Sequence, residues 1–201
     1  MRTIEVTVTY IDELLGTASA DPEIHARFIA SKAPDAPSRA DEVAAIGAEA
    51  VEERAMTVFP RTEDGQPFTW DYQWKGFFKD SCGMLRRADG TKSKGLKAYK
   101  KEIDGLLFVS PRRIPLVLPD GAEVGSCQRP LRASTPQGER VALANSETVP
   151  AGTTQTFQVH MLRDDLEPLV MEWLAYGRLH GKGQWRNSGK GRFTHVAHRV
   201  G

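Results

Sequence analysis

The clearest hydrophobic pattern is a strict alternation at the start of the chain. Apolar residues from Ile4 to Tyr10 alternate with threonine and glutamate, which is the period of a β-strand with one buried face. Residues 154–162 alternate in the same way, and residues 192–200 also have a strand pattern. The sequence therefore predicts that the chain begins and ends in strands.

Two other segments have the spacing of amphipathic helices. Apolar residues three and four positions apart recur over residues 74–87 and again over residues 164–177, and this spacing places them on one face of a helix. In the first segment, lysines and arginines occupy other positions. We expect this helix to have one face in the core and another that is cationic.

The connecting segments give weaker signals. Residues 103–118 contain two strand-like runs interrupted by prolines, and residues 125–144 contain strand-like pieces around a turn, which predicts a β-hairpin. Residues 20–60 are acidic with helical spacing, so we interpret them as an insertion. The lysine-rich residues 88–101 are interpreted as a solvated, mobile loop in preference to a dedicated binding element.

Taken in order, these elements are close to a β-α-β-β-α-β unit. The predicted fold class is therefore α+β, a ferredoxin-like (RRM-like) antiparallel sheet with a helical insertion and a projecting β-hairpin. A length of 201 residues with 40% apolar content is enough for one hydrophobic core. We expect a single elaborated domain over residues 1–201.

Composition argues against several classes of protein. No run approaches the roughly 18 apolar residues of a membrane span, and the chain starts with a strand pattern and no apolar signal region. Cys82 and Cys127 are far apart and form no CxxC motif, so neither a disulfide framework nor a zinc site is predicted. We expect a cytoplasmic protein with no metal, no cofactor and no membrane partner.

Charge is distributed unevenly along the chain. Residues 1–70 carry 6 Lys and Arg against 13 Asp and Glu, whereas residues 71–201 carry 21 against 13. No acidic residue follows Glu172. A basic face beside an acidic one suits nucleic-acid binding, and it equally suits head-to-tail association of like subunits.

The stretch with the most distinctive chemistry is residues 181–193, GKGQWRNSGKGRF, called the glycine-rich loop below. It contains four glycines, four cations and two aromatic residues. Glycines let backbone N–H groups approach an anion closely while the cations supply charge, so a phosphate backbone would fit. The alternative is a flexible basic loop that only improves solubility. The GxxxxGK[ST] pattern of a nucleotide-hydrolysing phosphate loop is absent.

Three separate stretches together resemble the RAMP superfamily of CRISPR-associated proteins. Residues 74–86 are similar to the family's KG helix, which ends in arginine, and residues 147–153, ETVPAGT, are similar to its motif before a strand. The glycine-rich loop is similar to the family's C-terminal G-x-G-x-x-R-x-x-G-x-G-R motif. The resemblance extends from about residue 68 onward and is weak over residues 20–60.

The resemblance implies a subunit that binds single-stranded RNA or DNA, with RNA favoured. Such a subunit would form the backbone of a CRISPR-like ribonucleoprotein with other CRISPR-type subunits, or a filament of its own copies, and residues 125–144 would be its thumb. Trp185 would stack on a base or, equally, anchor the last helix in the core. The residues expected to contact nucleic acid are Lys75, Lys79, Arg86, Arg129, Arg132, Lys182, Trp185, Arg186, Lys190 and Arg192.

Two other functions stay open. A decoy would bind CRISPR machinery through the acidic residues 41–64. An endoribonuclease, metal-independent or metal-assisted, would use Asp21, Asp35 or His25, but none of them lies in a convincing copy of a family motif. The other histidines show no metal-ligand spacing. We therefore favour a protein that is not an enzyme.

Overall fold

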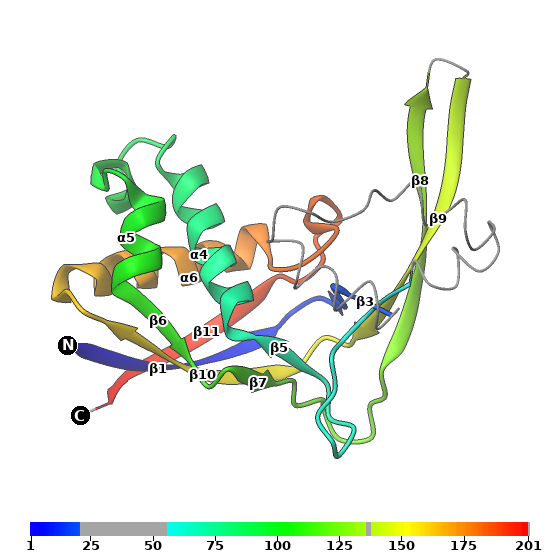
Figure 1. The fold of residues 1–201 in the computed structure, drawn as a ribbon, viewed down its shortest axis with the longest axis horizontal. Helices are drawn as coiled ribbons and strands as arrows, with labels where there is room; N and C mark the ends of the chain where they lie inside the picture. The colour runs from blue at the N-terminus through cyan, green and yellow to red at the C-terminus, as the bar shows by residue number, and fades with distance from the viewer. Residues whose placement is uncertain (21–55, 136–137, 201) are drawn as a thin grey trace, which may run out of the picture. The chain divides into compact units, whose positions relative to one another are not determined.

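The computed structural model describes residues 1–20, 56–135 and 138–200. Within these residues the protein is a mixed α+β structure with three α-helices and mainly antiparallel sheets (Figure 1). The chain forms two compact units. The first comprises Met1–Leu14, Pro60–Glu123 and the described part of 149–201, and the second comprises the described parts of 15–59 and 124–148. The helical insertion predicted at residues 20–60 falls almost entirely outside the described residues.

The first unit is built on a four-stranded sheet. Its strand order is β11 (Phe193–Val200), β1 (Arg2–Tyr10), β10 (Thr154–Met161) and β6 (Leu107–Ser110). All neighbours in this sheet are antiparallel. The strands predicted at both ends of the chain and over residues 154–162 are confirmed, and β1 and β11 are adjacent.

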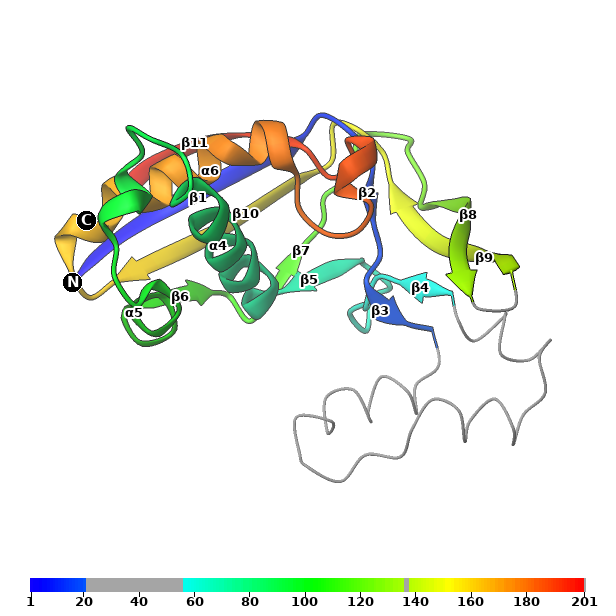
Figure 2. The ribbon, with the colours of Figure 1, turned by 90° about the horizontal axis from the view of Figure 1, so that it is seen from above.

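Three helices cover one face of this sheet: α4 (Asp71–Leu85), α5 (Tyr99–Leu106) and α6 (Glu167–His180) (Figures 1 and 2). Trp74 of α4 stacks on Phe157 of β10 with ring centroids 4.3 Å apart, and its ring also meets Phe193 of β11 at 5.4 Å. Trp74 is fully buried. Because a buried tryptophan removes a large apolar area from water, this side chain fixes α4 on the sheet.

The start of α4 follows from local sequence. The Gln73 side chain accepts a 3.0 Å hydrogen bond from the backbone N–H of Trp70, and Asp71 lies in the first turn. Both features stabilise a helix N-terminus, because they satisfy a free donor and complement the helix dipole. The two helices predicted from apolar spacing are confirmed, with α6 displaced by three residues toward the C-terminus.

The structure differs from the sequence prediction between α4 and β6. The predicted mobile loop at residues 88–101 contains the 3-10 helix η1 (Lys92–Gly95), and α5 begins at Tyr99. Helix α5 was not predicted because it is short and carries few apolar residues. Beyond β6, β7 (Arg113–Pro115) pairs with β5 (Phe68–Trp70) in a separate two-stranded ribbon.

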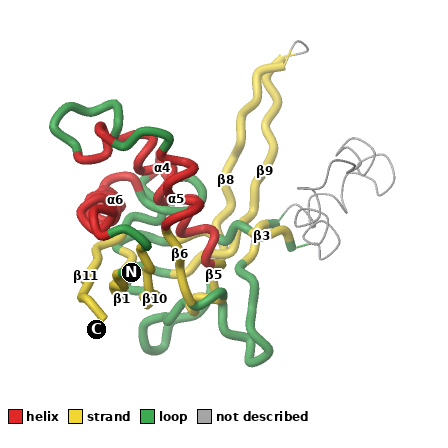
Figure 3. The backbone as a smooth tube through the Cα atoms, turned by 60° about the vertical axis from the view of Figure 1, so that its left-hand side comes forward, coloured by secondary structure: helices red, strands yellow, loops and turns green. Residues whose placement is uncertain are grey.

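The second unit contains a long antiparallel hairpin. Strands β8 (Gly125–Thr135) and β9 (Gly138–Val149) pair from Gly125 opposite Thr148 to Thr135 opposite Gly138 (Figure 3). The hairpin includes the residues for which the sequence predicts one. The sheet also includes β2 (Leu14–Leu15), β4 (Thr57–Val58) and β3 (Ala18–Ser19), and β4 pairs with β9 in parallel. The Glu147 carboxylate accepts a 2.8 Å hydrogen bond from the backbone N–H of Phe59 and so supports this sheet.

Candidate nucleic-acid interface

The two ends of the glycine-rich loop cross at van der Waals distance. The backbone N–H of Lys182 donates to the carbonyl of Gly191 at 2.9 Å. Both Gly181 and Gly191 have positive φ, and a Cβ built on Gly191 would lie 2.0 Å from the carbonyl oxygen of Lys182. No other residue fits there, because a side chain would collide with backbone that cannot move away. The glycines of the motif therefore fix the backbone geometry at the point where the two loop ends cross.

The crossing buries Lys182. Lys182 is only 5% exposed, and its Nζ lies 4.9 Å from the centroid of the Trp74 ring. Burial lowers the pKa of Lys182 to about 7, because an ammonium group loses its hydration in the interior. No carboxylate among the described residues forms an ion pair with it. The Trp74 ring supplies a cation–π contact, which compensates only part of that loss.

A second cluster lies beside Lys182. Arg186 of the loop donates from Nη1 to the carboxylate of Asp80 in α4, and His180 Nε2 lies 2.7 Å from the same carboxylate oxygen. Burial alone would raise the pKa of Asp80, but the hydrogen bonds from His180 and Arg186 outweigh it and lower the pKa below its ordinary value. Asp80 therefore stays ionised and holds the loop on α4.

These groups surround an open pocket of about 220 Å³. One wall is the exposed side of α4, and the other is the first half of the glycine-rich loop. The lining residues are Gln73, Gly76, Phe77, Asp80, Lys182, Gly183 and Arg186. At Gly76 an added Cβ would meet no atom within 4 Å. The lack of a side chain at this position therefore leaves the pocket open on the α4 side. The pocket joins two of the three segments that resemble the RAMP motifs.

The positive charges in the second half of the loop are neutralised by acidic residues that follow β1. Lys190 Nζ lies 2.5 Å from the Glu13 carboxylate, and Arg192 donates from Nε to Asp12 at 2.6 Å. The backbone N–H of Gly191 also donates to the carbonyl of Glu13. Neither acid lies in a recognisable motif, and each is about 180 positions from its partner. The sequence prediction therefore missed Asp12, Glu13 and Asp80.

Trp185 lies at the outer turn of the loop. Its backbone is left-handed with φ of 54°, and the residue is 38% exposed. The Lys190 ammonium lies 6.0 Å from the ring centroid. Of the two roles that the sequence leaves open for Trp185, the exposed position fits a stacking surface better than a core anchor.

Other predicted contact residues do not line this pocket. Lys75 donates to the carbonyl of Asp104 at 3.0 Å, and Lys79 pairs with the Asp104 carboxylate at 2.5 Å, so both turn toward α5. Arg86 lies over the ring of Tyr99. Arg129 is a buried residue of β8 in the second unit, where Arg132 follows on the same strand. A role in nucleic-acid contact stays a prediction for all of them.

The catalytic candidates from the sequence do not fall among the described residues. Asp21, His25 and Asp35 lie outside them, as does most of the acidic segment 41–64. Within the described ranges no three His, Cys, Asp or Glu side chains are grouped as metal ligands. None of the described helices has the length and apolar content needed to cross a membrane.

The comparison with known proteins gives a likeness to solved structures. The likeness is one of fold. Over 99% of its length the chain is similar to a chain in the cryo-EM structure of the Type III-B Cmr-beta bound to cognate target RNA, with a TM-score of 0.56 and 10% identity. It spans 60% of that chain. A chain of a Type IV-B CRISPR complex is similar over 98% of this chain and 90% of its own, with a TM-score of 0.49 and 12% identity. No protein-family model and no curated protein matches the sequence.

Proposed function

We propose that the chain is a RAMP-type subunit that binds single-stranded nucleic acid, RNA in preference to DNA, without cleaving it. The fold supports this proposal. In chain order the main elements of the first unit are β1, α4, β6, β10, α6 and β11, in a sheet ordered β11-β1-β10-β6. This order supports assigning the unit to a ferredoxin-like, RRM-like fold. Its similarity in fold to a chain of the Cmr-beta structure, which is bound to target RNA, is further support.

The three motifs also support it through their positions. The KG segment forms α4, the ETVPAGT segment ends β9 and leads into β10, and the glycine-rich loop connects α6 to β11. Two of these segments line one pocket. A backbone-type subunit of a CRISPR-like assembly, or of a filament of its own copies, is the form of the function that the family resemblance favours.

One observation carries the proposal. The Lys182 ammonium is buried beside an open pocket, and no described carboxylate neutralises it. A buried charge without a partner costs several kcal/mol. A phosphate oxygen in the pocket would supply the missing negative charge, and the desolvated surroundings would make that contact strong. Arg186 is held by Asp80 at the pocket wall and adds a second donor group.

The experiment is a titration of a fluorescein-labelled 12-nucleotide single-stranded RNA, followed by fluorescence anisotropy at two salt concentrations. The test variant is Lys182→Met, which keeps the volume and removes the charge. The matched control is Arg178→Met, because Arg178 is an exposed cation on α6, only four positions away. Losing a buried charge contact costs about 2–5 kcal/mol, so we expect Lys182→Met to weaken binding by about one hundredfold.

The control should change the affinity no more than a few-fold. Circular dichroism of both variants checks that each is folded. Wild-type protein that binds no RNA at low salt would contradict the function itself. Equal affinity of folded Lys182→Met and wild type would contradict the role of the pocket.

A further inference from the structure

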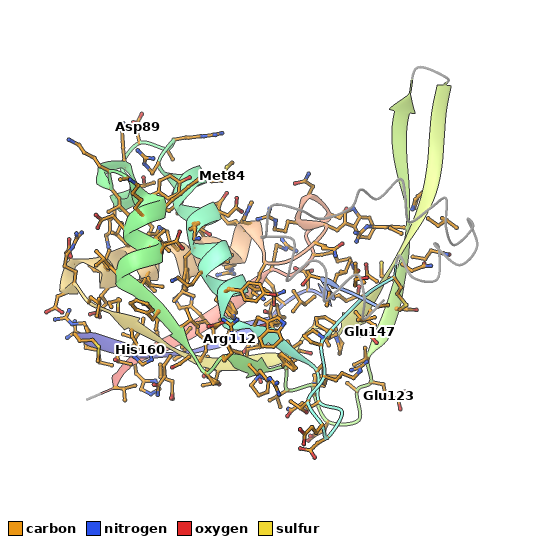
Figure 4. The ribbon with its side chains drawn as sticks, in the orientation of Figure 1. Met84, Asp89, Arg112, Glu123, Glu147 and His160 are labelled. Carbon is orange, nitrogen blue, oxygen red and sulfur yellow. The ribbon has the colours of Figure 1, made fainter. Side chains whose placement is uncertain are left out.

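A second surface of the first unit carries more accessible charge than the glycine-rich loop. Residues 86–101, called the cationic segment below, contain seven cations and one acid, Asp89. Figure 4 labels Asp89 in this segment, close to Met84 at the end of α4. Every one of the seven cations is exposed: Arg86, Arg87, Lys92, Lys94, Lys97, Lys100 and Lys101.

The backbone of the cationic segment is anchored. The Glu172 carboxylate of α6 accepts hydrogen bonds from the backbone N–H of Lys92 at 2.7 Å and of Ser93 at 3.0 Å, and from the Ser93 hydroxyl at 2.5 Å. The Ser93 oxygen in turn accepts from Trp173 Nε1 at 2.9 Å. Leu96 is buried. The cations therefore extend from a fixed frame, so little backbone entropy remains to be lost when they bind a ligand.

Most of these cations have no acidic partner in the part of the chain that the structure describes. Among the described residues, Lys94 pairs with Asp89, and Arg86 lies 5.0 Å from the ring centroid of Tyr99. The other five cations form no ion pair with a described carboxylate. Such a surface is attractive to a polyanion, and the attraction weakens as salt is added.

The composition of the cationic segment favours nucleic acid over an acidic protein. Protein interfaces are centred on buried aromatic or large apolar side chains. The exposed large apolar residues of the described chain include none from residues 86–101. Phosphate groups need only cations at suitable spacing, without a specific apolar contact.

We propose that the cationic segment is a second, sequence-independent contact for the phosphates of the bound strand. This inference rests on the proposed function in nucleic-acid binding. Arg86 follows Gly76, which lines the pocket, by ten residues of α4 and its C-cap. At 1.5 Å per residue the two surfaces are about 15 Å apart. A strand that advances about 3.4 Å per nucleotide spans this distance in four to five nucleotides.

The test is the salt dependence of RNA affinity. The variant Lys97→Gln with Lys100→Gln removes two exposed, unpaired cations from the segment. The control Arg113→Gln with Arg178→Gln removes two exposed cations from β7 and α6. The probe is the labelled 12-nucleotide single-stranded RNA, which is long enough to reach both surfaces. A second arm uses labelled polyglutamate in place of RNA.

Each phosphate contact contributes about −0.7 to the slope of log K against log salt for a single strand. We therefore expect the slope of the test variant to be shallower by about 1.4, and its affinity at 0.1 M salt to fall about 25-fold. The slope of the control should match that of the wild type.

Three results would overturn the inference. If the wild type binds RNA and the test variant has the same slope, the inference fails while the proposed function stands. If the wild type binds no RNA, both fail. If the test variant loses polyglutamate binding while its RNA binding is unchanged, the segment is a surface for an acidic protein.

Discussion

The glycine-rich loop and the cationic segment both look basic in the sequence, but their charges are used differently. In the loop, Arg186, Lys190 and Arg192 each contact a carboxylate of the same unit, and Lys182 is buried. In the cationic segment all seven cations are exposed. The loop therefore offers few charges in a defined position, whereas the segment offers many charges with little positional specificity.

The two backbones are also held in different ways. The two ends of the loop cross at glycines, and its cations are held by acidic residues that are remote in the sequence. The segment is held largely by one carboxylate, Glu172. We therefore propose different roles for the two regions: the loop positions one phosphate, and the segment supplies salt-sensitive affinity.

The largest effect is expected from a glycine substitution in the loop. Gly191→Ala places a Cβ 2.0 Å from the Lys182 carbonyl at a φ of 71°. The left-handed backbone alone costs about 1–2 kcal/mol, and the steric conflict adds to it, so we expect a loss of about 3 kcal/mol in the free energy of unfolding. The matched change in the cationic segment is Gly95→Ala, whose Cβ would meet no atom within 4 Å.

Urea denaturation of both variants measures this difference. Gly95→Ala should stay within about 0.5 kcal/mol of the wild type, as expected for an open surface site. Similar losses for the two variants would show that the crossing is not what makes the loop rigid.

A smaller effect is expected from the anchor of the cationic segment. Glu172→Gln keeps the shape but replaces an acceptor oxygen with a donor, so at least one backbone N–H loses its partner. The Lys92 amide is exposed and the Ser93 amide is partly buried, so water can replace part of the lost bond and the cost should lie below the value of about 1–3 kcal/mol for a fully buried donor. We expect faster hydrogen exchange at the amides of Lys92 and Ser93, with the amide of Lys182 unchanged. Unchanged protection at Lys92 and Ser93 would contradict the anchoring role of Glu172.

The buried lysine gives opposite pH dependences for folding and binding. The pKa of Lys182 is about 7 in the folded protein and near 10.5 when exposed. Between these values the unfolded chain binds more protons, so the free energy of unfolding rises with pH, by at most about 1.4 kcal/mol per pH unit. Bound phosphate would raise the pKa of Lys182, so RNA affinity should fall over the same range.

Urea denaturation and RNA titration at pH 7 and pH 9 measure both trends. The difference between wild type and Lys182→Met isolates this group from Asp80, His180 and Arg186, which line or adjoin the pocket in both proteins. If this difference in stability does not change with pH, Lys182 is not the buried titrating group.

The smallest effect concerns the ion pairs of the two regions. Lys190 and Glu13 have side chains 24% and 45% exposed, whereas Lys94 and Asp89 are 58% and 92% exposed. Exposed pairs contribute about 0–1 kcal/mol. A double-mutant cycle with Gln at both positions should give a larger coupling energy for Lys190 and Glu13 than for Lys94 and Asp89. An equal or smaller coupling energy for Lys190 and Glu13 would mean that the loop pair is at least as solvated as the surface pair.

Strands and helices whose apolar residues recur with a clear period could be predicted from the sequence. The alternation from Ile4 to Tyr10 gave β1, and the apolar spacing around Trp74 gave α4. Helix α5 could not be predicted in this way, because Ile103 is its one buried residue and Gly105 lowers its helix propensity. Local pattern reveals an element only when one of its faces is apolar.

The sequence predicts where the candidate site lies, but it does not predict which of the site's charges are neutralised. The glycines and cations of residues 181–193 mark the loop in the sequence. Which cations are neutralised depends on Asp12, Glu13 and Asp80, which are brought to the loop by the antiparallel pairing of β1 with β11 and by the packing of α4. Such contacts between distant residues have no local signature.

Titration of Lys182 itself tests the proposed phosphate contact most directly. Protein with ¹³C-labelled lysine is titrated by NMR between pH 6 and pH 10, with and without a saturating 12-nucleotide single-stranded RNA, and Lys182→Met assigns the signal. We expect a midpoint near pH 7 in the free protein and a higher midpoint with RNA bound. A free midpoint near the ordinary value for lysine, or a midpoint that RNA leaves unchanged, would contradict the claim that a buried ammonium at this pocket binds a phosphate.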